Sequence, residues 1–410
     1  MAVVIPRWRQ HGLTRALETR RVVLLTGARQ VGKTTLARSI ASANVEFRTL
    51  DDQTLRQAAE ADPISFVRHR ARTLIIDEIQ RVPALLPAIK QAVDDDNRPG
   101  QYLLTGSADV TTLSTAQESL AGRVAKLRLR PLTQGEFEQA TPTFLERAFE
   151  DRLGKTFAPV DRDQLLQLAF RGGYPEAAAF ADRKRRQWHT DYATAMLDRD
   201  LRDVAQVRRR QAIEDLLRIT AAWSSKLMDV SAIGAGLSLQ RPTLETYLAA
   251  LRALFLIDRV EPWIDRDYDR VGRHAKLFMA DSGLMASLLG WQIEQVKLDP
   301  DRSGKLVETF AYNEIAAQVE AGDGLYRLHH YRDREKREID LVIEREDGAL
   351  LGLEIKSGAT VESKDFKNLG WFKSNLAKGK PFTGLTLYAG NNALSFGAGM
   401  KAIPFSALWN

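Results

Sequence analysis

Val22-Val-Leu-Leu-Thr-Gly27-Ala-Arg-Gln-Val-Gly32-Lys33-Thr34-Thr35 is the stretch that decides the fold of the first third of this chain. Its four apolar residues predict a buried strand, glycines stand at positions 27 and 32 of the loop that follows, and Lys33 opens a helical pattern. This is the G-x-x-x-x-G-K-[ST] phosphate loop between a strand and a helix, the context that the motif requires. The sequence therefore predicts an α/β domain with a parallel sheet that binds a nucleoside triphosphate.

Each part of this loop has an expected role. The glycines let the backbone curl around an anion, so that successive N–H groups and the helix N-terminus point at phosphate. Lys33 is expected to reach the β- and γ-phosphates of ATP, and the Thr34 hydroxyl is expected to ligate Mg²⁺. The predicted nucleotide-binding residues are Gly27, Ala28, Arg29, Gln30, Val31, Gly32, Lys33, Thr34 and Thr35.

A second apolar run, Thr73-Leu-Ile-Ile-Asp77-Glu78, is typical of a Walker B strand. An uninterrupted apolar run suits a parallel sheet that is covered on both faces, and ligands gather at the carboxyl ends of such strands. Asp77 is predicted to hold Mg²⁺ through water, and Glu78 to orient or deprotonate the attacking water. The alternative is a core strand with a solvated acidic end, and the phosphate loop upstream favours the catalytic interpretation.

Two further segments are candidates for contact with the γ-phosphate. The strand predicted at residues 101–107 ends in hydroxyls, where AAA-type ATPases carry a sensor, and Thr105 or Ser107 is expected to bond the γ-phosphate or the lytic water. Arg123 precedes the alternating segment 124–130 and is a candidate arginine finger. A turn after a strand and a surface arginine are the competing interpretations. If Arg123 acts in trans, the chain works as a homo-oligomer.

Composition indicates which partners and which cell compartment to expect, and which kinds of site are excluded. Its 410 residues include 59 Lys and Arg against 53 Asp and Glu, which gives a net charge of +6 and mildly favours a polyanionic partner. No cysteine is present, so disulfides and cysteine zinc sites are excluded. The sequence has no run of eighteen apolar residues and no signal-peptide pattern. We therefore expect a cytoplasmic protein that does not enter a membrane.

The length is sufficient for two or three domains. We predict an AAA-type P-loop NTPase domain over residues 1–140, a helical domain over 141–295 and an α/β domain over 296–410. In the helical domain, residues 213–263 have the layout of a winged helix-turn-helix, with apolar residues at i, i+3, i+4 and i+7 after Pro242. The exposed start of that helix includes one cation, Arg241, so DNA and a protein stay equally open as partners.

A basic helical segment at residues 182–210 precedes this layout. Aspartates are interleaved with its arginines, so it is either a solvated helix face or a surface that contacts the phosphate backbone of a nucleic acid.

The C-terminal stretch carries a second candidate site. A helix is predicted at residues 304–315 and strands at 337–344 and 350–357, and the four candidate residues are Glu308, Asp340, Glu354 and Lys356. This pattern is typical of metal-dependent nucleases, in which Asp340 and Glu354 would hold Mg²⁺ and Lys356 would position the attacking water. The alternative is a nuclease-derived binding scaffold, whose acids are neutralised by Lys356 and by an arginine such as Arg334 or Arg337.

Eight motifs in order along the chain carry a resemblance to a known family: 27–35, 76–83, 104–107, 120–123, 131–137, 172–176, 280–284 and 354–358. On these motifs the chain resembles an uncharacterised bacterial and archaeal family that fuses an AAA-type P-loop ATPase to a C-terminal domain of unknown function. The resemblance implies an ATPase core, a winged-helix middle and a restriction-endonuclease-like, PD-(D/E)xK end. The genes of family members look like neighbours of mobile elements, defence genes and toxin–antitoxin operons, which implies an association with DNA.

These observations predict a Mg²⁺-dependent ATP-binding protein or ATPase whose nucleotide state controls binding to DNA or to a protein partner. Two alternatives stay open. One is an ATP-regulated DNA nuclease that uses the C-terminal site. The other is an antitoxin-like regulatory module in which ATP is a structural ligand with little turnover.

Overall fold

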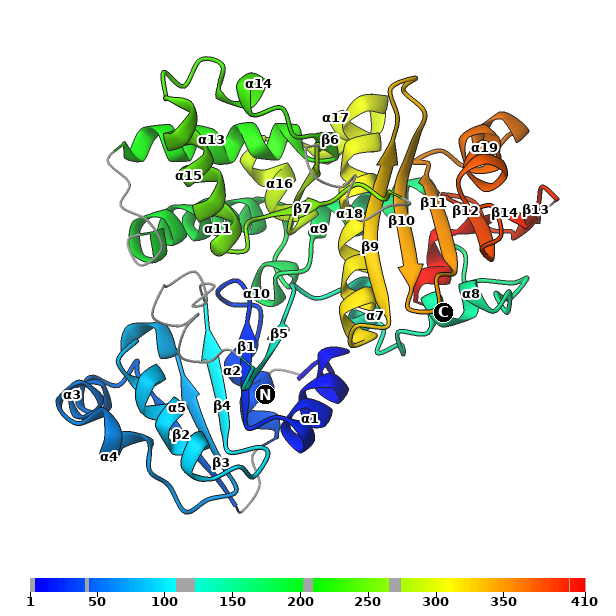
Figure 1. Cartoon of the computed structure of the whole chain (residues 1–410). Helices are drawn as coiled ribbons and strands as arrows, with labels where there is room; N and C mark the ends of the chain where they lie inside the picture. The colour runs from blue at the N-terminus through cyan, green and yellow to red at the C-terminus, as the bar shows by residue number, and fades with distance from the viewer. Residues whose placement is uncertain are drawn as a thin grey trace.

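The computed structural model describes residues 4–40, 44–107, 122–201, 209–264, 274–397 and 399–409 (Figure 1). Leu120 and Ala121 of the motif at 120–123, and residues 202–208 of the basic segment, lie outside these ranges. The described elements form three regions, and each region has its own sheet.

The N-terminal region is a five-stranded sheet with the order β2-β3-β4-β1-β5, in which all neighbouring strands are parallel. Its strands are β1 (Val22–Thr26), β2 (Val45–Thr49), β3 (Thr73–Asp77), β4 (Tyr102–Gly106) and β5 (Val124–Arg128). Its helices are α1 (Arg9–Thr19), α2 (Lys33–Ser39), α3 (Gln53–Ala61), α4 (Pro63–Val67) and α5 (Leu85–Asp95). The parallel α/β sheet predicted from the phosphate loop is confirmed.

Helices cover both faces of this sheet, which explains its apolar strands. In β1 all five residues are buried, and alternate side chains enter different cores: Val23 and Leu25 lie in one, and Val22 and Leu24 lie in the other. The first core contains Leu36 of α2, and the second contains Ile89 of α5. Because β1 lies between β4 and β5, its carboxyl end has a neighbouring strand on each side.

The middle region is mostly helical (Figure 1). Its helices are α9 (Arg162–Arg171), α10 (Pro175–Ala178), α11 (Asp182–Ala195), α13 (Arg210–Trp223), α14 (Val230–Gly234), α15 (Arg241–Ala253), α16 (Ser282–Leu288) and α17 (Ile293–Leu298). Two short helices that precede them in the chain, α7 (Gln134–Phe137) and α8 (Phe144–Phe149), lie beside the C-terminal region (Figure 1). Three short strands form an antiparallel sheet with the order β6-β8-β7: β6 (Lys226–Leu227), β7 (Ile257–Val260) and β8 (Lys276–Met279).

The C-terminal region packs one long helix, α18 (Pro300–Ala321), against a mixed six-stranded sheet (Figure 1). The sheet order is β13-β14-β12-β11-β10-β9, and α19 (Lys367–Asn375) lies between β11 and β12 in the chain. The strands are β9 (Tyr326–Arg332), β10 (Glu338–Arg345), β11 (Leu350–Ile355), β12 (Phe382–Tyr388), β13 (Leu394–Ser395) and β14 (Met400–Pro404). Asp299 caps α18 by accepting hydrogen bonds from the backbone N–H groups of Asp301 and Arg302.

None of the helices in the described ranges combines the length and the apolar character that crossing a bilayer requires.

Candidate functional site

The phosphate loop has the backbone geometry that its glycines predict. Gly27 and Gly32 have φ angles of +149° and +97°, which side chains rarely allow. A Cβ atom on Gly27 would lie 2.2 Å from the carbonyl oxygen of Leu129, so this position admits only glycine. The Lys33 side chain is 5% exposed, and its ammonium donates to the carbonyl oxygens of Gly27 (2.9 Å) and Ala28 (2.8 Å). The Lys33 ammonium therefore bonds the backbone of the phosphate loop that precedes it.

Asp77 lies at the carboxyl end of β3 and gathers hydroxyl groups around its carboxylate. Thr34 donates to Asp77 Oδ1 at 3.0 Å, and Thr105 at the end of β4 donates to the same oxygen. Burial raises the pKa of Asp77, while the hydrogen bonds from the two threonines oppose that effect. The structure thus brings Thr34, Asp77 and Thr105 together from three neighbouring segments.

Glu78 is the next residue and has a left-handed backbone, with φ of +59°. Its N–H donates to Thr105 Oγ1 at 3.2 Å, and its carboxylate accepts from the Gln80 side-chain amide. The same amide donates to Ser107 Oγ at 3.0 Å. Ser107 therefore reaches Glu78 through Gln80, a residue that we did not predict. Its position two residues after the acidic pair was the available signal.

The residues at this sheet edge fit a nucleotide with Mg²⁺. A threonine hydroxyl and a carboxylate 3.0 Å apart are the hard oxygen ligands that Mg²⁺ prefers. The ammonium of Lys33 lies over the loop, where the motif places the anionic phosphates.

Arg123 lies at the other end of the sheet. It directly precedes β5, and its guanidinium pairs with Asp94 of α5 at 2.5 Å. Because Val22 at the start of β1 lies beside Val124, this is the amino end of the sheet, whereas the phosphate loop follows the carboxyl end. Arg123 therefore does not approach the loop of its own chain, and a role toward a neighbouring copy stays a prediction.

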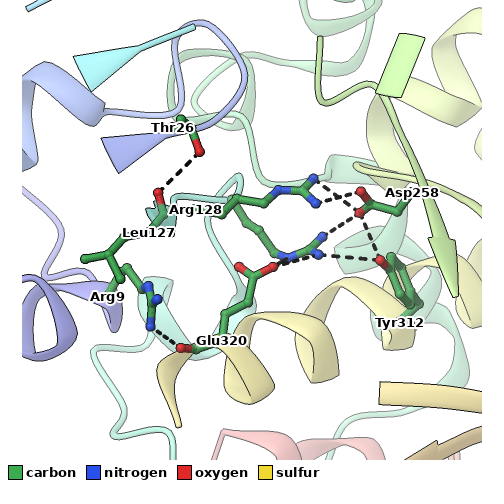
Figure 2. A network of polar contacts seen from close by, with 8 residues as sticks. Arg9, Thr26, Leu127, Arg128, Asp258, Tyr312 and Glu320 are labelled. Atoms are coloured by element: carbon green, nitrogen blue, oxygen red, sulfur yellow. Dashed lines mark hydrogen bonds and ion pairs between the residues drawn. The ribbon is translucent and has the colours of Figure 1, made fainter. Parts of the chain in front are cut away.

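A buried polar network connects the N-terminal sheet to both other regions (Figure 2). Asp258 of β7 accepts from Arg128 at 2.6 Å and from Arg130 at 2.8 Å, and Tyr312 of α18 donates to it at 2.9 Å. Arg130 also donates to Glu320 of α18 at 2.9 Å. Burial alone would raise the pKa of Asp258, but the two guanidinium groups hold it well below its ordinary value.

The acidic residues of the predicted C-terminal site do converge, and a lysine from the middle region lies among them. Lys276 of β8 is 1% exposed, and its ammonium lies 2.6 Å from Glu308 Oε1, 3.0 Å from Glu338 Oε1 and 3.1 Å from Asp340 Oδ1. Burial raises the pKa of Glu308 to about 7, against the opposing effect of Lys276. We did not predict Lys276, although a lysine within the apolar strand 275–279 was the available signal.

Of the other two members of the predicted quartet, Glu354 lies beside Asp340, and burial and the Asp340 charge raise its pKa, whereas Lys356 pairs with a different acid. The register that pairs Leu341 with Leu353 puts Asp340 across from Glu354. Lys356 follows the end of β11 and pairs with Asp365 at 3.4 Å, while Arg337 pairs with Asp333. Within the ranges that the structure describes, no group of three or more His, Cys, Asp or Glu side chains has an arrangement suited to a metal ion.

Comparison with known families identifies the region that carries the phosphate loop. Residues 19–138 match the family model of an AAA domain. This part of the chain is an AAA-type P-loop ATPase domain. Residues 162–295 match a domain of unknown function (DUF8612), and residues 303–408 match another (DUF4143).

Two relatives of this chain can be aligned with most of its length. The uncharacterized proteins Rv2008c of Mycobacterium tuberculosis and Mb2031c of Mycobacterium bovis are each 29% identical over 349 residues, which is 85% of this chain and 73% of the relative.

Among solved structures, the RuvB Holliday junction branch migration motor of Thermotoga maritima is 20% identical, with a TM-score of 0.28 over 62% of this chain and 90% of that one. AMPPCP-bound DnaA from Aquifex aeolicus is 13% identical, with a TM-score of 0.26 over 60% and 86%.

Proposed function

We propose that the AAA domain binds ATP with Mg²⁺ and hydrolyses it. The observation that carries this proposal is the meeting of Lys33, Thr34, Asp77 and Glu78 at one sheet edge. ATP, when bound, supplies the phosphoanhydride bond that water cleaves. Lys33 would offset phosphate charge, Thr34 and Asp77 would hold the metal, and Glu78 would orient or deprotonate water.

The hydroxyls beside the acidic pair support a sensing role. Thr105 contacts the Asp77 carboxylate and the Glu78 backbone, and Ser107 contacts Glu78 through Gln80. A nucleotide that draws Thr34 toward Mg²⁺ would therefore change the hydrogen bonds of Asp77, and with them those of the strand β4.

Equilibrium binding of a fluorescent ATP analogue tests the first part of this proposal. Lys33→Ala removes the cation of the phosphate loop, so we expect Mg²⁺-dependent binding to be lost. Lys126→Ala is the matched control, because Lys126 is an exposed lysine of β5 in the same sheet. Unchanged affinity in Lys33→Ala, or an equal loss in both variants, would contradict the proposal.

We further propose that nucleotide state is transmitted to the rest of the chain through Arg7. The Arg7 guanidinium donates to the carbonyl oxygen of Val31 in the phosphate loop at 2.6 Å and to that of Arg130 at 2.6 Å. The Arg130 side chain continues to Asp258 and Glu320 in the other two regions (Figure 2). Movement of the phosphate loop would thus displace Arg7 and Arg130, and Arg130 contacts both other regions.

The transmitted signal would act on a binding surface for DNA or for a protein. The order α13-β6-α14-α15-β7-β8, with an antiparallel sheet, supports the winged-helix interpretation of the middle region. At the start of α15, Arg241 pairs with Glu245 at 2.9 Å, which offsets the one cation there. Arg183 and Lys184 at the start of α11 are exposed and offer more positive charge, so we place the first contact with DNA phosphates on that helix.

The two alternatives make different demands on the chain. A nuclease needs a divalent metal among the C-terminal acids, where Lys276 lies. An antitoxin-like module with little turnover needs no catalytic base, whereas Glu78 is held beside Asp77 by hydrogen bonds with two neighbours, Thr105 and Gln80. Both observations favour the ATPase.

A further inference from the structure

The cluster around Lys276 joins charges from two regions of the chain. Lys276 lies on β8 of the middle region, Glu308 lies on α18, and Glu338 and Asp340 lie on β10. Sixty-two or more residues separate the lysine from the two strand acids. An ammonium that is 1% exposed is costly unless its partners are well placed, and here three carboxylates lie within 3.1 Å.

The surroundings complete the neutralisation of these acids. Arg332 of β9 donates to the second oxygen of Glu338 at 2.7 Å. Asp340 Oδ2 accepts from the backbone N–H of Ile355 at 2.9 Å, so both its oxygens are occupied. The carboxylates of Glu308, Glu338 and Asp340 thus already bind donors of the protein itself. Glu354 Oε1 is buried and has no hydrogen-bond partner among the described residues.

The edge strand β9 of the C-terminal sheet is fixed to the middle region by backbone contacts. The Trp263 N–H donates to the carbonyl oxygen of His330 at 2.6 Å, and the His330 N–H donates to that of Glu261 at 3.2 Å. The Trp263 ring packs edge-on against Phe372, with ring centroids 4.9 Å apart. Lys276 is thus held by a docked segment on the edge strand β9 and by its own strand pairing with β7.

We infer that Lys276 is the resident cation of the C-terminal acidic cluster, and that these acids bind the strand β8 of the middle region in place of a divalent metal. The cluster is then a docking site between two regions of one chain. Metal and Lys276 exclude one another, because both require Asp340. This inference does not depend on whether the AAA domain hydrolyses ATP.

Titration of Mn²⁺ into the nucleotide-free full chain, followed by the electron paramagnetic resonance signal of the free ion, tests the inference. We expect the wild type to bind no Mn²⁺ at the acidic cluster, so Asp340→Asn alone should leave Mn²⁺ binding unchanged. Lys276→Met keeps the length of the side chain and removes its charge, so it should gain one Mn²⁺ site, at least tenfold tighter than any in the wild type. Lys276→Met with Asp340→Asn should lose that site.

Lys356→Met is the matched control, because Lys356 is the lysine that the nuclease pattern singles out and it pairs with Asp365 instead. It should gain no Mn²⁺ site. A wild-type Mn²⁺ site that Asp340→Asn abolishes would overturn the inference, as would a folded Lys276→Met that gains none.

Melting temperature keeps the inference testable if Lys276→Met folds poorly. Combining it with Glu308→Gln, Glu338→Gln and Asp340→Asn removes the charges that the lysine neutralises. This fourfold variant should melt closer to the wild type than Lys276→Met does. A fourfold variant as unstable as the single one would show that Lys276 does not act as the cation of these acids.

Discussion

Replacing Asp258 with alanine should destabilise the whole chain more than the loss of any exposed ion pair. Asp258 is 8% exposed and is the shared partner of Arg128, Arg130 and Tyr312 (Figure 2). Its removal leaves Arg130 with Glu320 and leaves Arg128 stacked over the Phe255 ring. Removing one partner of a buried ion pair costs about 3–5 kcal/mol, because the remaining charge is buried without compensation.

Urea unfolding of the full chain, followed by tryptophan fluorescence and circular dichroism, measures this cost. Asp258→Asn should cost less than Asp258→Ala, since the amide oxygen still accepts from Tyr312 or one guanidinium. Glu245→Ala is the control, because its pair with Arg241 joins side chains that are 52% and 70% exposed. The reasoning is refuted if Asp258→Ala shifts the unfolding midpoint no more than Glu245→Ala.

Three more predictions concern separate parts of the molecule. Arg123→Ala should leave turnover in dilute protein unchanged, because Arg123 lies away from its own phosphate loop; a fall of about 10³, with turnover per chain that rises with concentration, would identify a finger acting in trans. DNA affinity should fall with a log–log salt slope near −0.9 per phosphate neutralised, and Arg183→Ala with Lys184→Ala should reduce that slope by about two phosphates; a flat salt response would indicate a protein partner. Burial raises the pKa of Glu314 to about 8, so the folded state holds this proton more tightly and stability should fall as pH rises from 4.5 to 8. Glu314→Gln should reduce that fall by up to about 5 kcal/mol; melting curves at pH 4.5 and pH 8.5 measure this, and an unchanged pH dependence would show that Glu314 is not the group responsible.

The AAA domain was predictable because its signals are local. The buried strands β1 and β3 are uninterrupted apolar runs, and the loop between Gly27 and Lys33 has a fixed spacing. The positions of Asp77 and Thr105 follow from these runs, because carboxyl ends of parallel strands meet at one sheet edge. The same rule shows that Arg123 lies away from the phosphate loop of its own chain: it precedes a strand, and so lies at the opposite edge, while a role in trans stays a prediction.

The contacts between regions could not be predicted, because the residues that make them have no regular spacing in the sequence. Arg7 reaches Val31 across 24 residues and Glu136 across 129, and neither pair has a recognisable spacing. The C-terminal acids were predicted from a helix–strand–strand pattern, which gave Glu308 and Asp340 correctly as neighbours. Their cation comes from a different region, so the choice between metal, arginine and Lys276 required the three-dimensional arrangement.

Phosphate release by Glu78→Gln, compared with the wild type at saturating Mg²⁺ and ATP, tests the proposed ATPase most directly. Glu78→Gln removes the carboxylate but keeps its shape and leaves the phosphate loop intact. We expect turnover to fall by on the order of 10² to 10⁴ with ATP affinity nearly unchanged, while Glu60→Gln, an exposed control on α3, should turn over ATP like the wild type. Wild-type turnover in Glu78→Gln, or no hydrolysis by the wild type itself, would contradict the account.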